Sequence, residues 1–213
     1  MRKVVMKRVA VFGSGNGSNF EAIARYFVDK NVEFVCISDK SDSYILQRAK
    51  NLGIQALHVS FKNTVAFLTK NKFDLIVLAG YMRILPREAI ELGTFVNIHP
   101  SLLPAFKGLD AIKQAYDYGV RITGVTTHFV NEEVDSGAVI EQKAVVIEDG
   151  MSLDELEAAI HRVEHEMYPT VIEKILFKRV LKKSNFLEKL AFSAPDLQKA
   201  KGNSGGEQPA ILS

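Results

Sequence analysis

The chain has 213 residues, of which 47% are hydrophobic, and a formal net charge of +2. This length allows one large domain or two small ones, and the nearly balanced charge indicates neither nucleic-acid binding nor a membrane surface. Cys36 is the single cysteine, which excludes an internal disulfide and a cysteine-cluster metal site. We find no signal peptide and no apolar run of about 20 residues, and therefore expect a cytoplasmic protein without a membrane span.

Strand and helix patterns alternate through the first half of the chain. The sequence predicts strands at residues 9–12, 32–38, 55–59 and 73–79. The first is expected to be buried, and the fourth is a nearly continuous apolar run, typical of a strand buried on both faces. Helical periodicity predicts helices at residues 20–28, 44–52, 63–70 and 87–92. This alternation predicts an α/β fold, a Rossmann-like, mostly parallel twisted sheet flanked by helices. Ligands of such sheets bind beyond the carboxyl ends of the strands.

A glycine-rich loop, residues 13–19, follows the first predicted strand and precedes a helix that Ser18 or Asn19 can cap. This order brings backbone N–H groups to an anion at a helix N-terminus. The loop lacks the Lys-Ser/Thr ending of a Walker A motif, and Ser18 stands where a dinucleotide motif has its third glycine. A phosphate monoester is therefore favoured over a dinucleotide, and a tight structural turn is the competing interpretation.

The segment Asn-Ile-His-Pro-Ser-Leu-Leu-Pro, residues 97–104, follows a further apolar run. Asn97 and His99 point to the same side if the backbone is extended, and Pro100 is expected to end the strand. The polar loops after three strands, including this one, should face one crevice. On these eight residues alone, a turn-capping Asn and a surface His are favoured over a reactive site.

The second half of the chain has a different pattern. We expect a helix at 111–118 and an antiparallel hairpin, 123–130 and 138–147, that extends the sheet. A capping box, Ser152 with Glu155, predicts a long helix to about residue 178, and Pro169 predicts a kink or break near Tyr168. Residues 179–213 are basic and then rich in Gly and Ser, which indicates a flexible tail after a single domain, 1–178.

Four motifs, in this order, resemble the glycinamide ribonucleotide (phosphoribosylglycinamide) formyltransferase family. They are residues 13–19, 78–85, 97–104 with Gly108, and 128–130 ahead of 135–137, within a similarity that covers about residues 9–175. Methionyl-tRNA formyltransferase and formyltetrahydrofolate hydrolase share the 97–104 core. The glycine-rich loop, a first strand near residue 9 and a short polar C-terminal stretch favour the purine-pathway enzyme. The hydrolase remains the alternative.

The resemblance implies transfer of a formyl group from 10-formyltetrahydrofolate to the amine of glycinamide ribonucleotide in IMP biosynthesis, through an oxyanion intermediate and without a metal. It assigns catalysis to Asn97, His99 and Asp135. The first two would donate hydrogen bonds to the oxyanion, while Asp135 would favour a charged His99 and position a water that shuttles a proton. Ser101 is expected to hold the loop rather than to attack. A non-catalytic nucleotide-binding module would leave these three residues without a role.

The same resemblance implies two binding regions, a nucleotide-phosphate half at about 1–95 and a folate and catalytic half at about 96–178. The nucleotide would contact Gly15, Asn16, Gly17, Ser18, Asn19 and Glu164. The folate would contact Met82, Arg83, Ile84, Leu85, Asn97 and Val134. Lys62 is the available cation where the family often has an arginine that meets the folate, and for Glu164 the residues alone favour a solvated helix carboxylate. We expect small-molecule partners and a monomer or homodimer.

Overall fold

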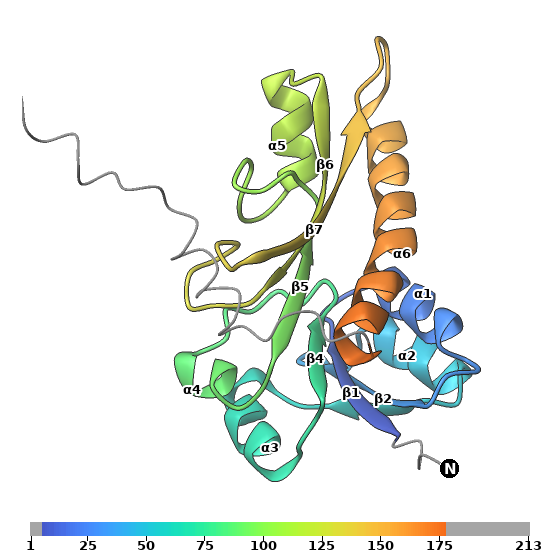
Figure 1. Ribbon diagram of the computed structural model, residues 1–213, viewed down its shortest axis with the longest axis vertical. Helices are drawn as coiled ribbons and strands as arrows, with labels where there is room; N and C mark the ends of the chain where they lie inside the picture. Colours follow the sequence, from blue (N-terminus) through green and yellow to red (C-terminus); the bar gives the residue numbers. More distant parts are fainter. Residues whose placement is uncertain (1–5, 178–213) are drawn as a thin grey trace, which may run out of the picture. The chain divides into compact units, whose positions relative to one another are not determined.

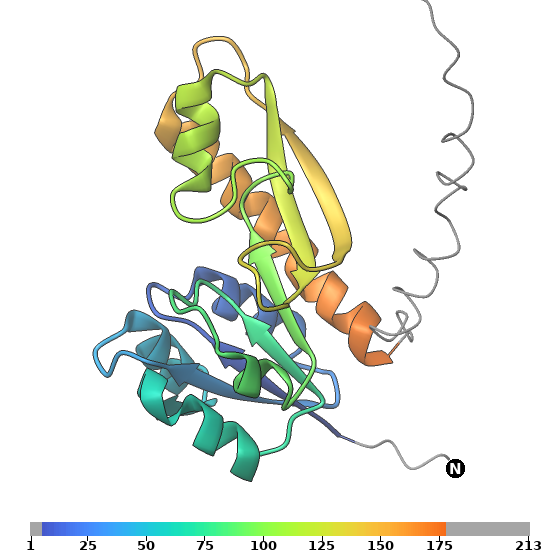
Figure 2. The ribbon, with the colours of Figure 1, turned by 90° about the vertical axis from the view of Figure 1, so that its left-hand side faces the viewer.

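The computed structural model describes residues 6–177 (Figures 1 and 2). They form one seven-stranded sheet in the order β3-β2-β1-β4-β5-β6-β7. The first five strands along the chain pair in parallel, and they are β1 (Lys7–Phe12), β2 (Val32–Ser38), β3 (Gln55–His58), β4 (Leu75–Leu78) and β5 (Phe95–His99). The last two, β6 (Ile122–Phe129) and β7 (Val139–Val146), pair antiparallel as a hairpin. The predicted fold class is confirmed.

The helices lie in the predicted places. They are α1 (Ser18–Tyr26), α2 (Tyr44–Asn51), α3 (Thr64–Lys70), α4 (Arg87–Ile90), α5 (Ala111–Tyr118) and α6 (Leu153–Phe177), with a 3₁₀ turn, η1 (Phe61–Asn63), before α3. In Figure 2 the hairpin and α5 lie at one end of the sheet, and the parallel strands with α3 lie at the other. Within residues 6–177, no helix is both long and apolar enough to cross a membrane.

Two cores cover the two faces of the sheet. In β1, Val9 and Val11 belong to the core that includes α1, α2 and α6, whereas Ala10 and Phe12 belong to the core beneath α3 and α4. This alternation follows from the period of two along a strand. Burial on both faces explains why residues 9–12 of β1 and all of β4 read as continuous apolar runs.

The long helix α6 begins at the predicted capping box. The Ser152 backbone N–H donates to Glu155 Oε2 (2.8 Å), and the Glu155 N–H donates to Ser152 Oγ (3.3 Å). The helix is not interrupted at Pro169, which rules out a break there, and a kink near Tyr168 stays a prediction. Tyr168, Val171 and the proline itself are buried, and their packing against the sheet and α1 outweighs the roughly 3 kcal/mol that a proline costs inside a helix. Figure 1 shows α6 running past β7 and β6 to α1.

β5 pairs in parallel with β4 and antiparallel with β6, and this places Asn97 and His99 of β5 opposite the hairpin. Asn97 of β5 lies directly across from His128 of β6, and His99 lies across from Thr126. Pro100 follows the last residue of β5, as predicted. Polar groups of the two strands therefore meet at one end of β5.

Candidate active site

Asp135, in the loop between β6 and β7, is the residue on which the predicted catalytic side chains converge. Its carboxylate lies 3.3 Å from His99 Nδ1 and 3.5 Å from Asn97 Nδ2. His128 Nε2 lies 3.6 Å from Asp135 Oδ1, the carboxylate oxygen that also faces Asn97. The structure thus brings together Asn97, His99 and Asp135, and it adds His128 of β6.

The backbone around Asp135 is shaped to hold this position. Asp135 itself has a positive φ of 49°, and its Oδ2 accepts a hydrogen bond from the Gly108 N–H at 2.9 Å. Gly137, two residues on, packs so closely that a Cβ atom there would lie 1.6 Å from the carbonyl oxygen of Phe129. A side chain at Gly137 would therefore displace the loop that carries Asp135.

The Asp135 carboxylate is held in its charged form. Burial is the largest influence and would raise its pKa, but the facing His128 ring, the Gly108 N–H and the attraction of His99 outweigh it. The net effect is a pKa below the usual value, so the carboxylate is ionised at neutral pH.

The His99 ring is buried, and both of its nitrogens face oxygen atoms. Nε2 lies 2.8 Å from the carbonyl oxygen of Phe106, and Nδ1 faces Asp135. A carbonyl only accepts, so Nε2 is the donor in the first contact. Phe106 has a positive φ of 52°, an uncommon conformation for a bulky residue, and this backbone directs its carbonyl toward His99. The orientation of the imidazole is therefore fixed before any ligand binds.

Asn97 is oriented by His128. His128 Nδ1 lies 2.8 Å from the carbonyl of Phe129, which requires a proton on Nδ1. Its Nε2 lies 3.2 Å from Asn97 Nδ2 and 3.6 Å from Asp135 Oδ1, and Asn97 Nδ2 lies 3.5 Å from the same carboxylate oxygen.

Ser101 shapes the loop after β5, as predicted. Its hydroxyl donates to the Ala105 carbonyl at 2.5 Å, and its own carbonyl accepts from Thr126 Oγ1 at 2.7 Å. The residue is fully buried. These bonds account for the Ser101 side chain without a nucleophilic role.

The glycine-rich loop lies between β1 and α1. Gly17, with φ of 79°, is the N-cap residue directly before α1, and no side chain of residues 6–177 caps the helix there. The predicted cap by Ser18 or Asn19 is therefore wrong, because both are already helical. A Cβ atom on Gly17 would lie 2.6 Å from Ile45 in α2, so the turn requires glycine. The helix thus starts with open N–H groups, as an anion site requires.

Glu164 is 4% exposed, although it lies on a surface-type helix pattern. Its Oε2 accepts hydrogen bonds from Asn19 Nδ2 at 3.1 Å and from His161 Nδ1 at 2.8 Å. The solvated carboxylate that the residues alone favoured is therefore wrong. The hydrogen bond that His161 donates to Glu164 raises the pKa of His161. Sequence reasoning missed this histidine, and its i, i+3 spacing from Glu164 was the available signal.

The predicted folate residues follow β4, with Val134 in the opposite loop. Met82 and Ile84 are 58% and 69% exposed, and Val134 is also exposed, whereas the Leu85 side chain belongs to the core. Arg83 forms an ion pair with Asp39 at 2.7 Å. Sequence analysis did not consider Asp39.

Lys62 is an exposed residue of η1, next to Phe61 in the chain. The Phe61 ring lies 5.9 Å from the Arg83 guanidinium. Lys62 therefore belongs to a segment that packs beside the predicted folate loop.

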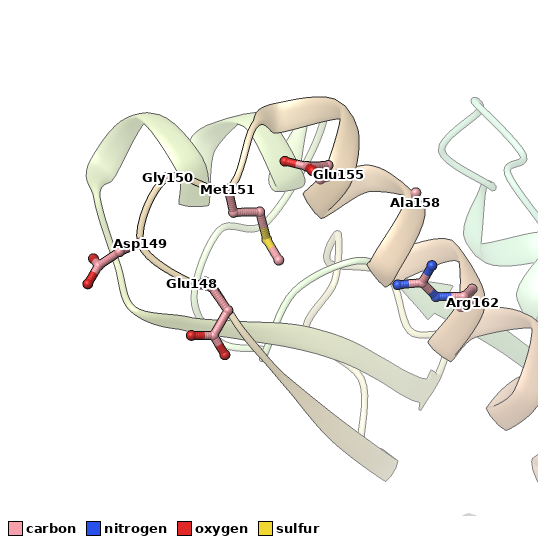
Figure 3. Close-up of a pocket in the computed structure, with 7 residues that line it drawn as sticks. All are labelled: Glu148, Asp149, Gly150, Met151, Glu155, Ala158 and Arg162. Atoms are coloured by element: carbon pink, nitrogen blue, oxygen red, sulfur yellow. The ribbon is translucent and has the colours of Figure 1, made fainter.

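A separate surface hollow lies where β7 leads into α6 (Figure 3). It is lined by Glu148, Asp149, Gly150, Met151, Glu155, Ala158 and Arg162. None of these is a predicted site residue, and Glu155 is engaged by Ser152 in the capping box. The hollow takes no part in the site described above.

Comparison with known proteins shows to which protein family a chain with this sheet and site belongs. The sequence pattern of the family described as Formyl transferase matches residues 7–172. The chain therefore belongs to the formyl transferase family, and the family predicted from the motifs is confirmed.

The relatives narrow the class further. A Bacillus subtilis (strain 168) protein named phosphoribosylglycinamide formyltransferase is 40% identical over 186 residues, which cover 80% of this chain and 95% of the relative. The structure of glycinamide ribonucleotide transformylase 1 from Geobacillus kaustophilus superposes with a TM-score of 0.76 at 41% identity, over 81% of this chain and 100% of that one. Phosphoribosylglycinamide formyltransferase from Streptococcus pneumoniae TIGR4 gives 0.74 at 40% identity, over 80% and 99%.

Proposed function

We propose that the protein transfers the formyl group of 10-formyltetrahydrofolate to the amine of glycinamide ribonucleotide, a step of purine biosynthesis. The names of its relatives describe a formyltransferase that acts on phosphoribosylglycinamide. The convergence of Asn97 and His99 on the buried Asp135 carboxylate is the observation that supports this most directly. Acyl transfer requires donors placed where negative charge develops, and these two side chains offer them.

The proposed reaction is a direct displacement. The neutral amine attacks the formyl carbon, and the carbonyl electrons move onto oxygen to form a tetrahedral oxyanion. The oxyanion then collapses, the bond from carbon to N10 of the folate breaks, and the proton lost by the attacking nitrogen is delivered to N10. We assign that proton transfer to a water held by Asp135.

Asn97 and His99 stabilise the oxyanion in this scheme. Their contacts to Asp135, 3.5 and 3.3 Å, are long for hydrogen bonds, so a formyl oxygen beside the carboxylate can take over both N–H groups. Because Nε2 of His99 donates to the Phe106 carbonyl, the N–H that would serve the oxyanion is the one on Nδ1, which faces Asp135. Each such donor contributes about 10²–10³ in rate in enzymes that use them.

The nucleotide is proposed to bind at the start of α1. The N–H groups of Gly15, Asn16, Gly17, Ser18 and Asn19 would hold its phosphate. Glu164, buried beside Asn19, would accept from the ribose hydroxyls. This region favours the transferase over the hydrolase alternative, which needs no nucleotide.

The folate is proposed to lie between the loop after β4 and the loop that carries Val134 and Asp135. The exposed side chains of Met82, Ile84 and Val134 would contact it, along with the backbone at Leu85. Because Arg83 is paired with Asp39, we assign the acidic tail of the folate to Lys62. Lysine is a less directional partner for a carboxylate than arginine.

The test mixes the protein with 10-formyltetrahydrofolate and follows the release of tetrahydrofolate, with and without glycinamide ribonucleotide. We expect release only when the nucleotide is present. Release at the same rate without it would replace this proposal by the hydrolase. Glu164→Ala should raise the KM for the nucleotide while the KM for the folate stays unchanged.

A further inference from the structure

We propose that Asp39 is a positioning residue that fixes the formyl-donor loop, residues 80–85, against the end of β2. This inference rests on the proposed function, because it assigns that loop to the folate. Asp39 acts through Met82 and Arg83 and is not itself assigned a contact with either substrate.

The Asp39 side chain is fully buried and lies just beyond the carboxyl end of β2. Its Oδ2 accepts from Arg83 Nε at 2.7 Å, and its Oδ1 accepts from Ser14 Oγ at 2.6 Å. Ser14 Oγ in turn accepts the backbone N–H of Met82 at 3.0 Å. One carboxylate therefore holds two consecutive residues of the donor loop, one directly and one through a hydroxyl.

The hydrogen bonds among Asp39, Ser14 and Met82 are compatible with the protons and lone pairs of these groups. The single hydroxyl proton of Ser14 goes to Asp39, which leaves its lone pairs free to accept from Met82. Burial would raise the pKa of Asp39, but the hydrogen bonds from Ser14 and Arg83 bring it below the usual value, so the group is charged. Hydrogen bonds to charged groups are among the stronger contacts in proteins.

The donor loop depends on these polar anchors because it has few apolar ones. Met82 and Ile84 are largely exposed, and only Leu85, at the far end of the loop, is packed in the core. Arg83 is itself 49% exposed, so without Asp39 its side chain would be free to move into solvent. Loss of the carboxylate should therefore loosen the loop more than it loosens the fold.

The glycine-rich loop is also held by hydrogen bonds that do not involve Asp39. The Ser14 N–H donates to the Gly80 carbonyl at 3.0 Å regardless of the Asp39 side chain. Arg48 of α2 donates from Nε to the Asn16 carbonyl (2.9 Å) and from Nη2 to Asn16 Oδ1 (2.8 Å). Arg48 thus holds the glycine-rich loop as Asp39 holds the donor loop. A variant of Arg48 therefore provides a matched control for the variant of Asp39.

The experiment is steady-state kinetics of the full chain with each substrate varied in turn. Asp39→Asn should raise the KM for 10-formyltetrahydrofolate about tenfold, with kcat and the nucleotide KM changed by less than about twofold. Arg83→Met should do the same, and the double variant should be no worse than Asp39→Asn alone. Arg48→Met should give the opposite pattern, a higher nucleotide KM and an unchanged folate KM.

Three results would overturn the inference. The first is an unchanged folate KM in both single variants. The second is equal increases in both KM values. The third is a further increase in the double variant, which would mean that Arg83 contacts the folate directly. If Asp39→Asn fails to fold, Arg83→Met decides, because that residue is half exposed.

Direct binding separates this inference from the proposed function. Calorimetric titration with 10-formyltetrahydrofolate should show weaker binding to Asp39→Asn than to the wild type, whether or not formyl transfer occurs. A wild type that binds the folate but transfers nothing would refute only the proposed function. A wild type that does not bind it would refute both.

Discussion

Replacement of Asp135 by Asn removes one charge from the centre of the site while keeping the shape of the side chain. The new amide can still accept from the Gly108 N–H, but it no longer carries the charge that faces His99 at 3.3 Å. Loss of this support impairs both the oxyanion donor and the proton transfer. We expect kcat to fall about 10³-fold, which is about 4 kcal/mol of transition-state stabilisation.

The same change should weaken the fold only moderately. Charged hydrogen bonds contribute about 1.5–3 kcal/mol each, within a total stability of about 5–15 kcal/mol for a domain, so Asp135→Asn should remain folded at pH 7. The folded-state pKa of Asp135 lies below its ordinary value of 3.8. Its stabilising contribution is therefore present above that value and is lost as the pH falls through the folded pKa. The stability gap between wild type and variant should close in that acid range.

Tetrahydrofolate release in the presence of the nucleotide measures kcat. Urea unfolding at pH 7 and at pH 3 measures the difference in the free energy of unfolding between wild type and variant. Asp117→Asn is the control, because it makes the same chemical change at an exposed carboxylate that pairs with Lys113. It should change neither quantity. An Asp135→Asn enzyme that keeps more than a tenth of kcat would refute the role assigned to this carboxylate.

Three further changes test other parts of the structure. The pKa of His161 is raised above 6.5 by Glu164, so the stabilising contribution of this pair is present below that pH and is lost as the pH rises through the folded pKa. Thermal melts should show this loss in wild type and not in His161→Gln; identical profiles would contradict it. The Tyr168 hydroxyl lies 2.8 and 3.1 Å from carbonyl oxygens of β4 and β5 and shares its single proton between them, so Tyr168→Phe should cost about 1–3 kcal/mol in urea unfolding. No change would mean that these carbonyls are satisfied without it. Gly17→Ala meets a positive φ and the Ile45 side chain, so it should cost at least about 1–2 kcal/mol and raise the nucleotide KM, whereas wild-type melting and kinetics would show that the turn adapts.

The central strands β1, β2 and β4 were predictable because most of their residues are buried. β2 has the predicted bounds, and β1 differs by two residues, since an apolar run marks a buried strand whatever surrounds it. The absence of a break at Pro169 could not be predicted by this local reasoning. The cost of a proline is local, but the burial of its neighbours that offsets the cost depends on tertiary packing that no sequence window contains.

Some residues of the site were likewise predictable from the sequence, and others were not. Asn97 and His99 were predictable as a pair because two residues on one strand share a face. Asp135 lies 38 residues beyond Asn97, and only the family resemblance singled it out. Asp39 and Arg83 are 44 residues apart and carry no spacing signal, so their ion pair was invisible before the fold was known.

The hydrogen bond between Asn19 and Glu164 joins α1 to α6 across 145 residues of chain. A ribosome that adds about 5–20 residues per second takes about 7–30 s to make that length. During this interval the glycine-rich loop is already synthesised, but its partner carboxylate does not yet exist. A nucleotide therefore cannot use this contact to stabilise the nascent chain, and the strands β1 to β4 must rely on their own packing until α6 is complete.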